Sequence, residues 1–369
     1  MKVQKGILPD SSHPIWMVLD ENYLPIEPIQ KYLHYLDSIG RSPNTIQAYA
    51  HNLKLFWEFL RDSKLDWLEV NLEQLSNFIH WLRNPNKNVL SIEPQISKRS
   101  EKTINHCLTT VCGFYEFQER IGAINRVDAY RYQLQPGRKY KSFLHHISKG
   151  KEVKTRLLKV KEPKTFPGCL TQSQVNSLIE ACNSLRDKFL LRLLYETGLR
   201  VGEALGLRHE DMKTGKNNEI HVVPRIDNVN NGRVKSGAER IVHVNKELMQ
   251  WYCAYLIDEY PEDIDCDFVF VVIKAPAKGE VGTPLKYKTI DSLFRRLSKK
   301  TNIKVTPHLL RHTHATELIR AGWDMAYVQK RLGHTDIQTT VNTYVHLTED
   351  DLRIEYNKYL VVKNNKNEA

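Results

Sequence analysis

The sequence lacks the features of a membrane or secreted protein. Its longest continuous apolar run in the second half, Phe268 to Ile273, is far too short to cross a bilayer. The segment from Met1 to Asp10 carries lysines but no apolar stretch, so it does not resemble a secretory signal. The six cysteines are scattered and form no Cys-x-x-Cys pair, which indicates neither a zinc site nor a disulfide framework. We therefore expect a reduced, cytoplasmic protein that does not associate with membranes.

Positive charge is what the sequence has in excess. The 369 residues carry a formal net charge of +11, and 41% of them are hydrophobic. An apolar fraction of this size is sufficient for ordinary hydrophobic cores, and the length allows one to three domains. The charge says nothing about the fold, but it favours a polyanionic partner.

The first third of the chain predicts a helical domain after a short extension. Residues 1–21 show no clear period, and we expect them to be irregular. Between residues 22 and 134, apolar residues recur at helical spacing in four segments. Ser42 followed by Pro43 is typical of a helix start, and Ser100 is a second candidate cap. On pattern alone, a plain helical bundle is favoured over any specific role.

A basic segment follows, and we expect residues 135–168 to be an interdomain linker. The stretch from Arg131 to Lys164 holds eleven Lys or Arg and two Glu, so it carries +9 of the total +11. It also contains two prolines and two glycines and has no sustained period. Such a segment can be a solvated tether, or it can lie along a phosphate backbone and release counterions. Both interpretations stay open.

Residues 169–369 predict a second domain that is mostly helical with a small sheet. Thr171 to Gln174 fits a capping box at its start. Short β-branched runs predict strands at 219–225 and 240–244, with another around 268–273. Helices are expected at 246–260, 288–300, 307–321 and 325–332. The predicted fold class is mainly α with a small antiparallel β-sheet.

The stretch from Thr306 to His346 contains side chains that suit phosphate chemistry. His308 and Arg311 are three residues apart, so they share one face of the expected helix. His334 follows Gly333 at the end of the next helix, and Tyr344 lies ten residues further on. Such side chains could bind a phosphate, manage its protons and attack it.

These residues and their spacing resemble the C-terminal signature of the tyrosine recombinases, the phage integrase family. The signature is present as His308-Leu-Leu-Arg311, Leu332-Gly333-His334, Thr339-Thr340 and Tyr344. The family's first box, with a Thr-Gly-Leu-Arg motif, is matched from Thr197 to Leu205. Each box alone would be weak, but their order and spacing over roughly 150 residues are specific. In length and layout the chain is also similar to the transposase A proteins of site-specific bacterial transposons.

The resemblance implies a fold and a set of roles. Members of the family have a helical core-binding (SAM-like) domain and a catalytic domain that form a C-shaped clamp around DNA. By resemblance, Arg200 and Arg311 bind the scissile phosphate, Tyr344 is the nucleophile, and His334 donates a hydrogen bond to the phosphate. His308 assists Tyr344, Lys235 is the general acid, and Glu203 positions the catalytic groups. The reaction needs no cofactor and no metal. A lysine in a polar turn is usually only solvated, so the role of Lys235 rests on the resemblance.

Several alternatives remain at this point. The leading hypothesis is a site-specific recombinase of a mobile element, either an integrase or a transposase. A type IB topoisomerase uses the same attack, and a DNA-binding regulator could retain an inactive recombinase scaffold. His308 and His312 are spaced as in zinc-protease helices, but Leu309 stands where that motif needs a glutamate. The expected partners are double-stranded DNA, three further copies of the chain in a tetrameric synapse, and accessory recombination proteins.

Overall fold

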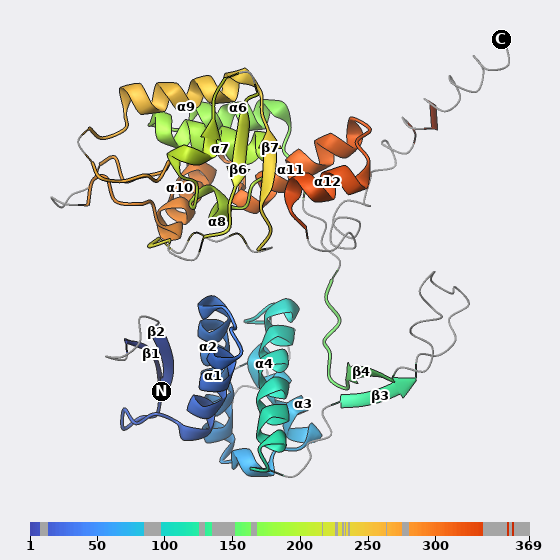
Figure 1. Cartoon of the computed structure of the whole chain (residues 1–369). Coiled ribbons are helices and arrows are strands. Elements are labelled where there is room, and N and C mark those ends of the chain that lie inside the picture. Colours follow the sequence, from blue (N-terminus) through green and yellow to red (C-terminus); the bar gives the residue numbers. More distant parts are fainter. Residues whose placement is uncertain are drawn as a thin grey trace. The chain divides into compact units, whose positions relative to one another are not determined.

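The computed structural model describes most of the chain in two compact units. The described residues are 1–7, 14–84, 97–124, 130–134, 152–163, 168–215, 217–225, 228–230, 232, 234, 237–262, 264–274, 280–334, 353 and 356–357. The units span Met1–Lys164 and Thr165–Ala369 (Figure 1). Among the described residues, no helix has the length and apolar character that crossing a membrane requires.

The first unit is built on four helices, as the spacing of apolar residues predicted. These are α1 (Glu27–Ser38), α2 (Pro43–Ser63), α3 (Leu72–Arg83) and α4 (Glu101–Arg120). The side chains of Ser42 and Ser100 accept hydrogen bonds from the backbone N–H groups of Thr45 and Thr103. Each serine therefore satisfies one of the N–H groups that a helix start leaves unpaired. The predicted helical domain and both of its serine caps are confirmed.

The N-terminal residues differ from the prediction, because they form a β-hairpin rather than an irregular extension. Strand β1 (Lys2–Ile7) pairs antiparallel with β2 (Pro14–Leu19), in a register that places Val3 opposite Val18. Val18 is buried, and Val3 and Trp16 pack against the helical core. Contacts with α1 and α2 therefore stabilise a hairpin whose own alternation of apolar and polar residues is too weak to predict it.

The basic segment also contains secondary structure that its composition did not predict. Strand β3 (Tyr130–Leu134) pairs antiparallel with β4 (Glu152–Arg156). The chain that follows β4 is held by a side chain of the helical unit. The amide nitrogen and the amide oxygen of Asn105, on α4, both form hydrogen bonds with the backbone of Val160. Its Nδ2 donates to the carbonyl of Val160 at 2.8 Å, and its Oδ1 accepts from the N–H of Val160 at 2.9 Å. These two hydrogen bonds, called the Asn105 clasp below, hold the end of the basic segment on the helical unit.

The second unit combines helices with a three-stranded sheet. Its helices are α6 (Gln172–Glu180), α7 (Leu185–Thr197), α8 (Val201–Ala204), α9 (Lys246–Asp258), α10 (Tyr287–Thr301), α11 (Pro307–Arg320) and α12 (Met325–Leu332). The sheet has the order β5-β6-β7 and is antiparallel, with β5 at Met212–Lys213, β6 at Glu219–Val222 and β7 at Arg240–His243. The predicted fold class is confirmed.

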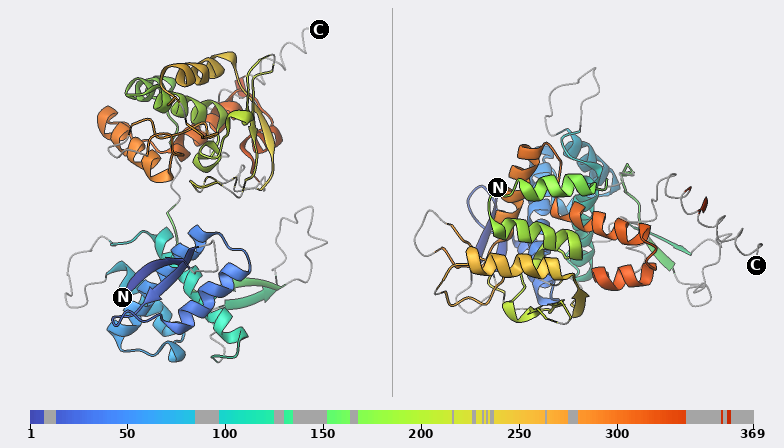
Figure 2. Two further views of the ribbon diagram at one scale, coloured as in Figure 1. Left: turned by 60° about the vertical axis from the view of Figure 1, so that its left-hand side comes forward. Right: turned by 90° about the horizontal axis from the view of Figure 1, so that it is seen from above.

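Helix α7 is the centre of this unit. It packs against both α9 and α11 (Figure 2), and Phe189, Leu190 and Leu194 on it are fully buried. The predicted strand at 268–273 does not form a ladder. Its backbone makes only single bridges, from Phe268 to Arg208 and from Val271 to Pro284. The partners are loop residues, and a few backbone hydrogen bonds flank the second bridge, from Leu285 N–H to the carbonyl of Phe270 and from Val272 N–H to the carbonyl of Thr283.

Candidate active site

The first box begins where α7 ends. Gly198 has a left-handed backbone, with φ of 66°, and a Cβ on it would lie 2.7 Å from Leu332 Cδ2 and 2.8 Å from His314 Cδ2. Only glycine combines this conformation with such close neighbours. The turn directs the chain into Arg200, which is the residue preceding α8. The glycine of the Thr-Gly-Leu-Arg motif thus places the first candidate arginine against α11 and α12.

Glu203 forms the negative centre of the site. Its side chain is fully buried, and it accepts hydrogen bonds from the backbone N–H of Arg200 at 2.9 Å and from Arg200 Nη1 at 3.0 Å. Arg240 binds both carboxylate oxygens, at 3.2 and 2.7 Å. Burial raises the pKa of Glu203, but the hydrogen bonds and charge of Arg240, together with Arg200, outweigh burial and lower it. Glu203 is therefore an ionised carboxylate held between two guanidinium groups.

Helix α11 supplies the second candidate arginine. Thr306 caps the helix through its side chain, and Pro307 occupies the first turn, as predicted. Arg311 is 1% exposed, and its Nη1 donates to the carbonyl of Gly198 at 2.6 Å. Nη1 of Arg311 also lies 4.0 Å from Glu203 Oε2. The two arginines of the motif therefore come from segments far apart in sequence and meet around one carboxylate.

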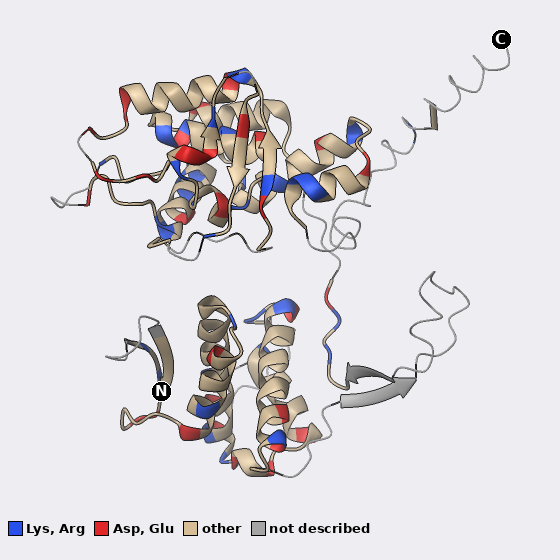
Figure 3. Cartoon of the chain, in the orientation of Figure 1, with Lys and Arg blue, Asp and Glu red and all other residues tan. Residues whose placement is uncertain are grey.

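The carboxyl end of α12 receives guanidinium groups from three different elements. The last carbonyls of a helix have no partner within it, so they attract donors and positive charge. Arg240 Nε donates to the carbonyl of Arg331 at 2.9 Å, and Arg311 Nη2 to that of Leu332 at 2.8 Å. Arg200 Nη1 donates to the carbonyl of Gly333 at 3.2 Å. Figure 3 shows basic residues gathered on α12 and the adjoining part of β7.

His334 follows this helix end directly. Its backbone N–H donates to the carbonyl of Gln329, and Gln329 Nε2 donates to its carbonyl, so the turn is held from both sides. Burial, followed by the charges of Arg311, Arg200 and His308, lowers the pKa of His334 to about 4. Near neutral pH the imidazole is therefore uncharged and can donate one hydrogen bond without adding a positive charge.

The structure brings five of the seven predicted residues into one region. Arg200, Glu203 and Arg311 are in direct contact, and His334 lies close enough for both arginines and His308 to shift its pKa. His308 is exposed on α11, one turn before Arg311. Lys235 and Tyr344 lie outside the described residues. Their roles therefore remain predictions.

The chain leading to Lys235 is anchored beside the first box. Asn230 is buried, and its Nδ2 donates to the carbonyls of Leu205 and Leu285 at 2.8 and 3.1 Å. Its Oδ1 accepts from the N–H of Gly232 at 3.0 Å. A buried amide with this many partners fixes the path of the backbone. Asn230 thereby ties the segment before Lys235 to Leu205, the residue that follows α8.

Two residues in the site, Arg240 and Arg331, were missed by the sequence analysis. Arg240 occupies an inward position of β7, where the alternation leads one to expect an apolar side chain, and a charge at such a position is the signal that could have found it. Arg331 donates to the carbonyls of His243 and Glu196 at 3.0 Å each and to His314 Nε2 at 3.1 Å. It therefore joins α12 to β7, α7 and α11.

His314 gives the second unit a testable acid sensitivity. Burial, followed by the charges of Arg331 and Arg311, lowers its pKa from 6.5 to about 3. A histidine whose pKa is lower in the folded than in the unfolded protein favours the folded state most at pH values above the pKa of the unfolded chain. This contribution to the free energy of unfolding is lost as pH falls from about 6.5 toward 3. Compared with pH 8, we expect its contribution at pH 5 to be smaller by about 2 kcal/mol. Urea unfolding at both pH values measures this difference.

The matched variant for this prediction is His314→Gln, which keeps an acceptor for Arg331 but cannot be protonated near neutral pH. Its free energy of unfolding should fall less between pH 8 and pH 5 than that of the wild type. An equal fall in the two proteins would show that His314 is not the group responsible.

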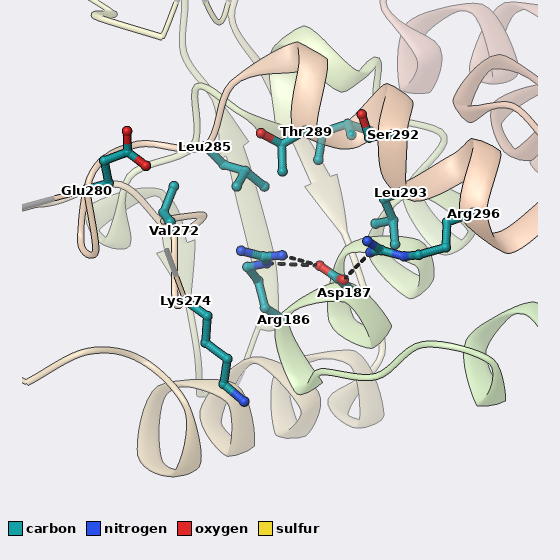
Figure 4. A pocket seen from close by; sticks show the side chains of 11 residues that line it. Arg186, Asp187, Val272, Lys274, Glu280, Leu285, Thr289, Ser292, Leu293 and Arg296 are labelled. Carbon is teal, nitrogen blue, oxygen red and sulfur yellow. Dashed lines mark hydrogen bonds and ion pairs between the residues drawn. The ribbon is translucent and has the colours of Figure 1, made fainter. Parts of the chain in front are cut away.

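A different polar pocket lies at the opposite end of α7 (Figure 4). It is lined by Arg186, Asp187 and Arg296, with Lys274 and Glu280 at its edge. Arg186 donates to Asp187 Oδ1 through Nε and Nη2, at 2.9 and 2.7 Å, and Arg296 lies 3.8 Å from Asp187 Oδ2. The buried charges satisfy one another, and α7 separates them from Arg200 by about 20 Å of helix. The pocket is not part of the candidate active site.

The sequence matches two known domain families. Residues 169–351 match the phage integrase family, and residues 29–122 match its N-terminal SAM-like domain. The fold and the site define a tyrosine recombinase, an enzyme that breaks and rejoins DNA strands. The chain belongs to the phage integrase family.

The relatives refine this class. The chain is 45% identical over 367 residues to transposase A from transposon Tn554 of Staphylococcus aureus, covering 99% of this chain and all of that protein. It is 28% identical to tyrosine recombinase XerA of Saccharolobus solfataricus, covering 91% and 93% of the two chains. The chain is thus a tyrosine-type site-specific recombinase and a homologue of the Tn554 transposase.

A solved structure supports the fold. The transposon Tn1549 integrase, in complex with transposon right end DNA, aligns with a TM-score of 0.60 at 21% sequence identity. The alignment covers 90% of this chain and 99% of that one. Both the helical unit and the second unit therefore have the architecture of a known recombinase.

Proposed function

We propose that this recombinase binds the scissile phosphate of duplex DNA between Arg200 and Arg311. The observation that carries the proposal is that both arginines donate to oxygens at the carboxyl end of α12, beside an ionised Glu203. Guanidinium groups stay charged and bind phosphate oxygens through planar pairs of donors. As the transition state forms, negative charge on the non-bridging oxygens is stabilised by donors that are already in place.

The reaction assigned to the site is a reversible transfer of the phosphate to Tyr344. The phenolic oxygen forms a bond to phosphorus, and the bond from phosphorus to the 5′ oxygen of the DNA breaks. His308 accepts the phenolic proton or orients Tyr344, and Lys235 protonates the leaving 5′ oxygen. The 3′-phosphotyrosine keeps the energy of the phosphodiester, so a different 5′ hydroxyl can attack it and restore the tyrosine. His334 contributes a neutral hydrogen bond to the phosphate.

The proposed partner is double-stranded DNA. The structural relatives include a Tn1549 integrase bound to transposon DNA and a lambda integrase dimer bound to a core site. We assign residues 22–134 the role of the core-binding domain and residues 169–369 that of the catalytic domain, with residues 135–168 as the basic linker. Strand exchange between two sites would use four copies of the chain. The similarity to transposase A favours transposition of a mobile element over a role in chromosome maintenance.

Trapping the covalent intermediate tests this function. On a duplex with a nick beside the scissile phosphate, the released fragment diffuses away and the intermediate accumulates. We expect a protein–DNA adduct on a denaturing gel, and we expect peptide mapping to place the 3′ phosphate on Tyr344. Transfer of the trapped strand to a second duplex would show recombination, whereas relaxation of supercoiled plasmid without such transfer would indicate a topoisomerase. The proposal would be contradicted if the protein formed no adduct on DNA from the ends of the mobile element that carries its gene.

A further inference from the structure

The third arginine at the carboxyl end of α12 has no role in the reaction described so far. Arg240 is the first residue of β7, and its side chain is 7% exposed. On one side it binds both oxygens of Glu203, and on the other its Nε donates to the carbonyl of Arg331. Arg240 is therefore a bridge between the carboxylate that contacts Arg200 and the helix that precedes His334.

The backbone of α12 is shaped around this guanidinium. Gly333 has a φ of 65°, and a Cβ on it would lie 2.7 Å from Arg240 Nη1 and 2.9 Å from its Cζ. Any other residue at this position would push into Arg240 as well as adopt a strained conformation. The glycine of the Leu-Gly-His motif therefore makes room for Arg240, and this packing defines where the next residue, His334, begins.

We assign Arg240 no direct contact with the phosphate, because all three nitrogens of its guanidinium group make hydrogen bonds within the protein. Its Nε, Nη1 and Nη2 are engaged with the carbonyl of Arg331 and the carboxylate of Glu203. Arg200, in contrast, has a side chain that is 25% exposed and shares the same carboxylate. An effect of Arg240 on the reaction must therefore pass through Glu203 or through the end of α12.

The charges around Glu203 explain what Arg240 does. The groups that face this carboxylate are Arg200 before α8, Arg240 on β7, Arg311 on α11 at 4.0 Å, and His334 after α12. Without Arg240, a buried carboxylate would depend mainly on Arg200 for compensation. It would then either take up a proton or bind Arg200 more closely, and both outcomes change the position or charge of a phosphate ligand.

We propose that Arg240 is a positioning residue for DNA strand cleavage, acting through Glu203 on Arg200 and through the end of α12 on His334. The inference rests on the proposed function of the site and adds a residue that contacts neither the phosphate nor the nucleophile. The competing explanation is that Arg240 contributes only to the stability of the fold.

The test is single-turnover adduct formation on the nicked duplex by Arg240→Met, measured between about pH 6 and pH 9. Methionine keeps much of the buried volume but makes neither contact. We expect cleavage slower by about 10²-fold, as for other small displacements of catalytic groups. The rate should also fall more steeply toward low pH than that of the wild type, because Glu203 without Arg240 takes up a proton more readily. Binding to the intact site should change little.

The matched control is Arg225→Met. Arg225 binds both oxygens of Asp211, at 2.8 and 2.7 Å, and also contacts Glu210. It makes the same kind of paired contact with a buried carboxylate in the same unit, and none of its hydrogen bonds among the described residues reaches Arg200, Glu203, Arg240, Arg311 or His334. We expect this variant to cleave at the wild-type rate at temperatures where it stays folded. A loss of stability alone would therefore affect both variants alike.

A double variant separates positioning from packing. Because part of the effect of Arg240 passes through Glu203, the loss of rate in Arg240→Met combined with Glu203→Gln should be smaller than the product of the two single losses. If Arg240→Met does not fold, Arg240→Lys decides the matter. It retains the charge but cannot bind Glu203 and the carbonyl together, so slower cleavage at an unchanged melting temperature supports the proposal.

Three outcomes would overturn the inference. They are a wild-type rate and pH profile in Arg240→Met, a wild-type rate in Arg240→Lys, and losses that simply multiply in the double variant. In each case the wild-type protein still forms its adduct, so the proposed function stands. Absence of an adduct with the wild-type protein would instead overturn the proposed function and the inference together.

Discussion

Tyr344→Phe is expected to form no detectable covalent adduct with DNA while binding its site as the wild type does. The substitution removes one oxygen and keeps the ring, so packing around it changes little. Among the residues from His334 to His346, the other hydroxyl groups belong to threonines. A phenol, with a pKa near 10, loses its proton far more readily than an aliphatic alcohol, and it is also the better leaving group when the step reverses. Denaturing gels of the nicked duplex measure the adduct, and gel shifts measure binding.

Tyr327→Phe is the control for this variant. Tyr327 lies on α12, close in sequence to the site, and is 68% exposed. It has no assigned role, so its variant should form the adduct at the wild-type rate. An adduct with Tyr344→Phe, or a phosphate that maps to another residue, would show that the alignment of the motif with the sequence is wrong.

Arg311→Lys is expected to slow adduct formation by about 10² or more, as for the loss of a donor that stabilises an oxyanion. Lysine keeps the positive charge but cannot span the carbonyls of Gly198 and Leu332 and also present paired donors to a phosphate. The rate is measured in single-turnover reactions on the nicked duplex. The melting temperature of the variant shows how much of the loss comes from unfolding, because Arg311 is almost completely buried.

Chemistry on the DNA separates a role in charge stabilisation from a role in folding. A scissile methylphosphonate replaces one non-bridging oxygen with a methyl group and removes its negative charge. If Arg311 stabilises that charge, the ratio of wild-type to variant rates should be smaller on the methylphosphonate than on the natural phosphate. An unchanged ratio would mean that Arg311 acts by holding the fold together and not by contacting the phosphate.

The features predictable from the sequence were those encoded by local periodicity or by a specific motif. The stripe of Ile29, Tyr32, Leu33 and Leu36 predicted α1, and the same four residues are buried in it. Pro307 and Gly333 correctly predicted the start of α11 and the end of α12. The two boxes predicted that Arg200 and Arg311 meet, although only tertiary packing brings α8 to α11. Neighbouring residues alone determine the helix signals, whereas the meeting of the two arginines was implied by the resemblance to the family.

The features that escaped prediction depend on contacts between distant segments. The hairpin of β1 and β2 is stabilised by packing on the helices, and the single bridges at 268–273 depend on which loops lie beside them. Arg240 has a role only because Glu203 and Gly333 come to it from elsewhere in the chain. Spacing within the sequence carries no information about such meetings. An arginine at an inward strand position indicates a partner but does not identify it.

The Asn105 clasp limits the length of chain that is left to connect the two units. Because the clasp fixes Val160 to the helical unit, only a few residues between Glu162 and Gly168 remain to connect the units, a reach of about 20 Å when extended. If both units bind one duplex, as proposed, the first to bind confines the second to a small volume around it. Short linkers of this kind give effective concentrations in about the millimolar range, so two weak contacts can act as one strong one. If the proposal holds, a single asparagine far from the chemistry in sequence would lengthen the time that the enzyme stays on its site.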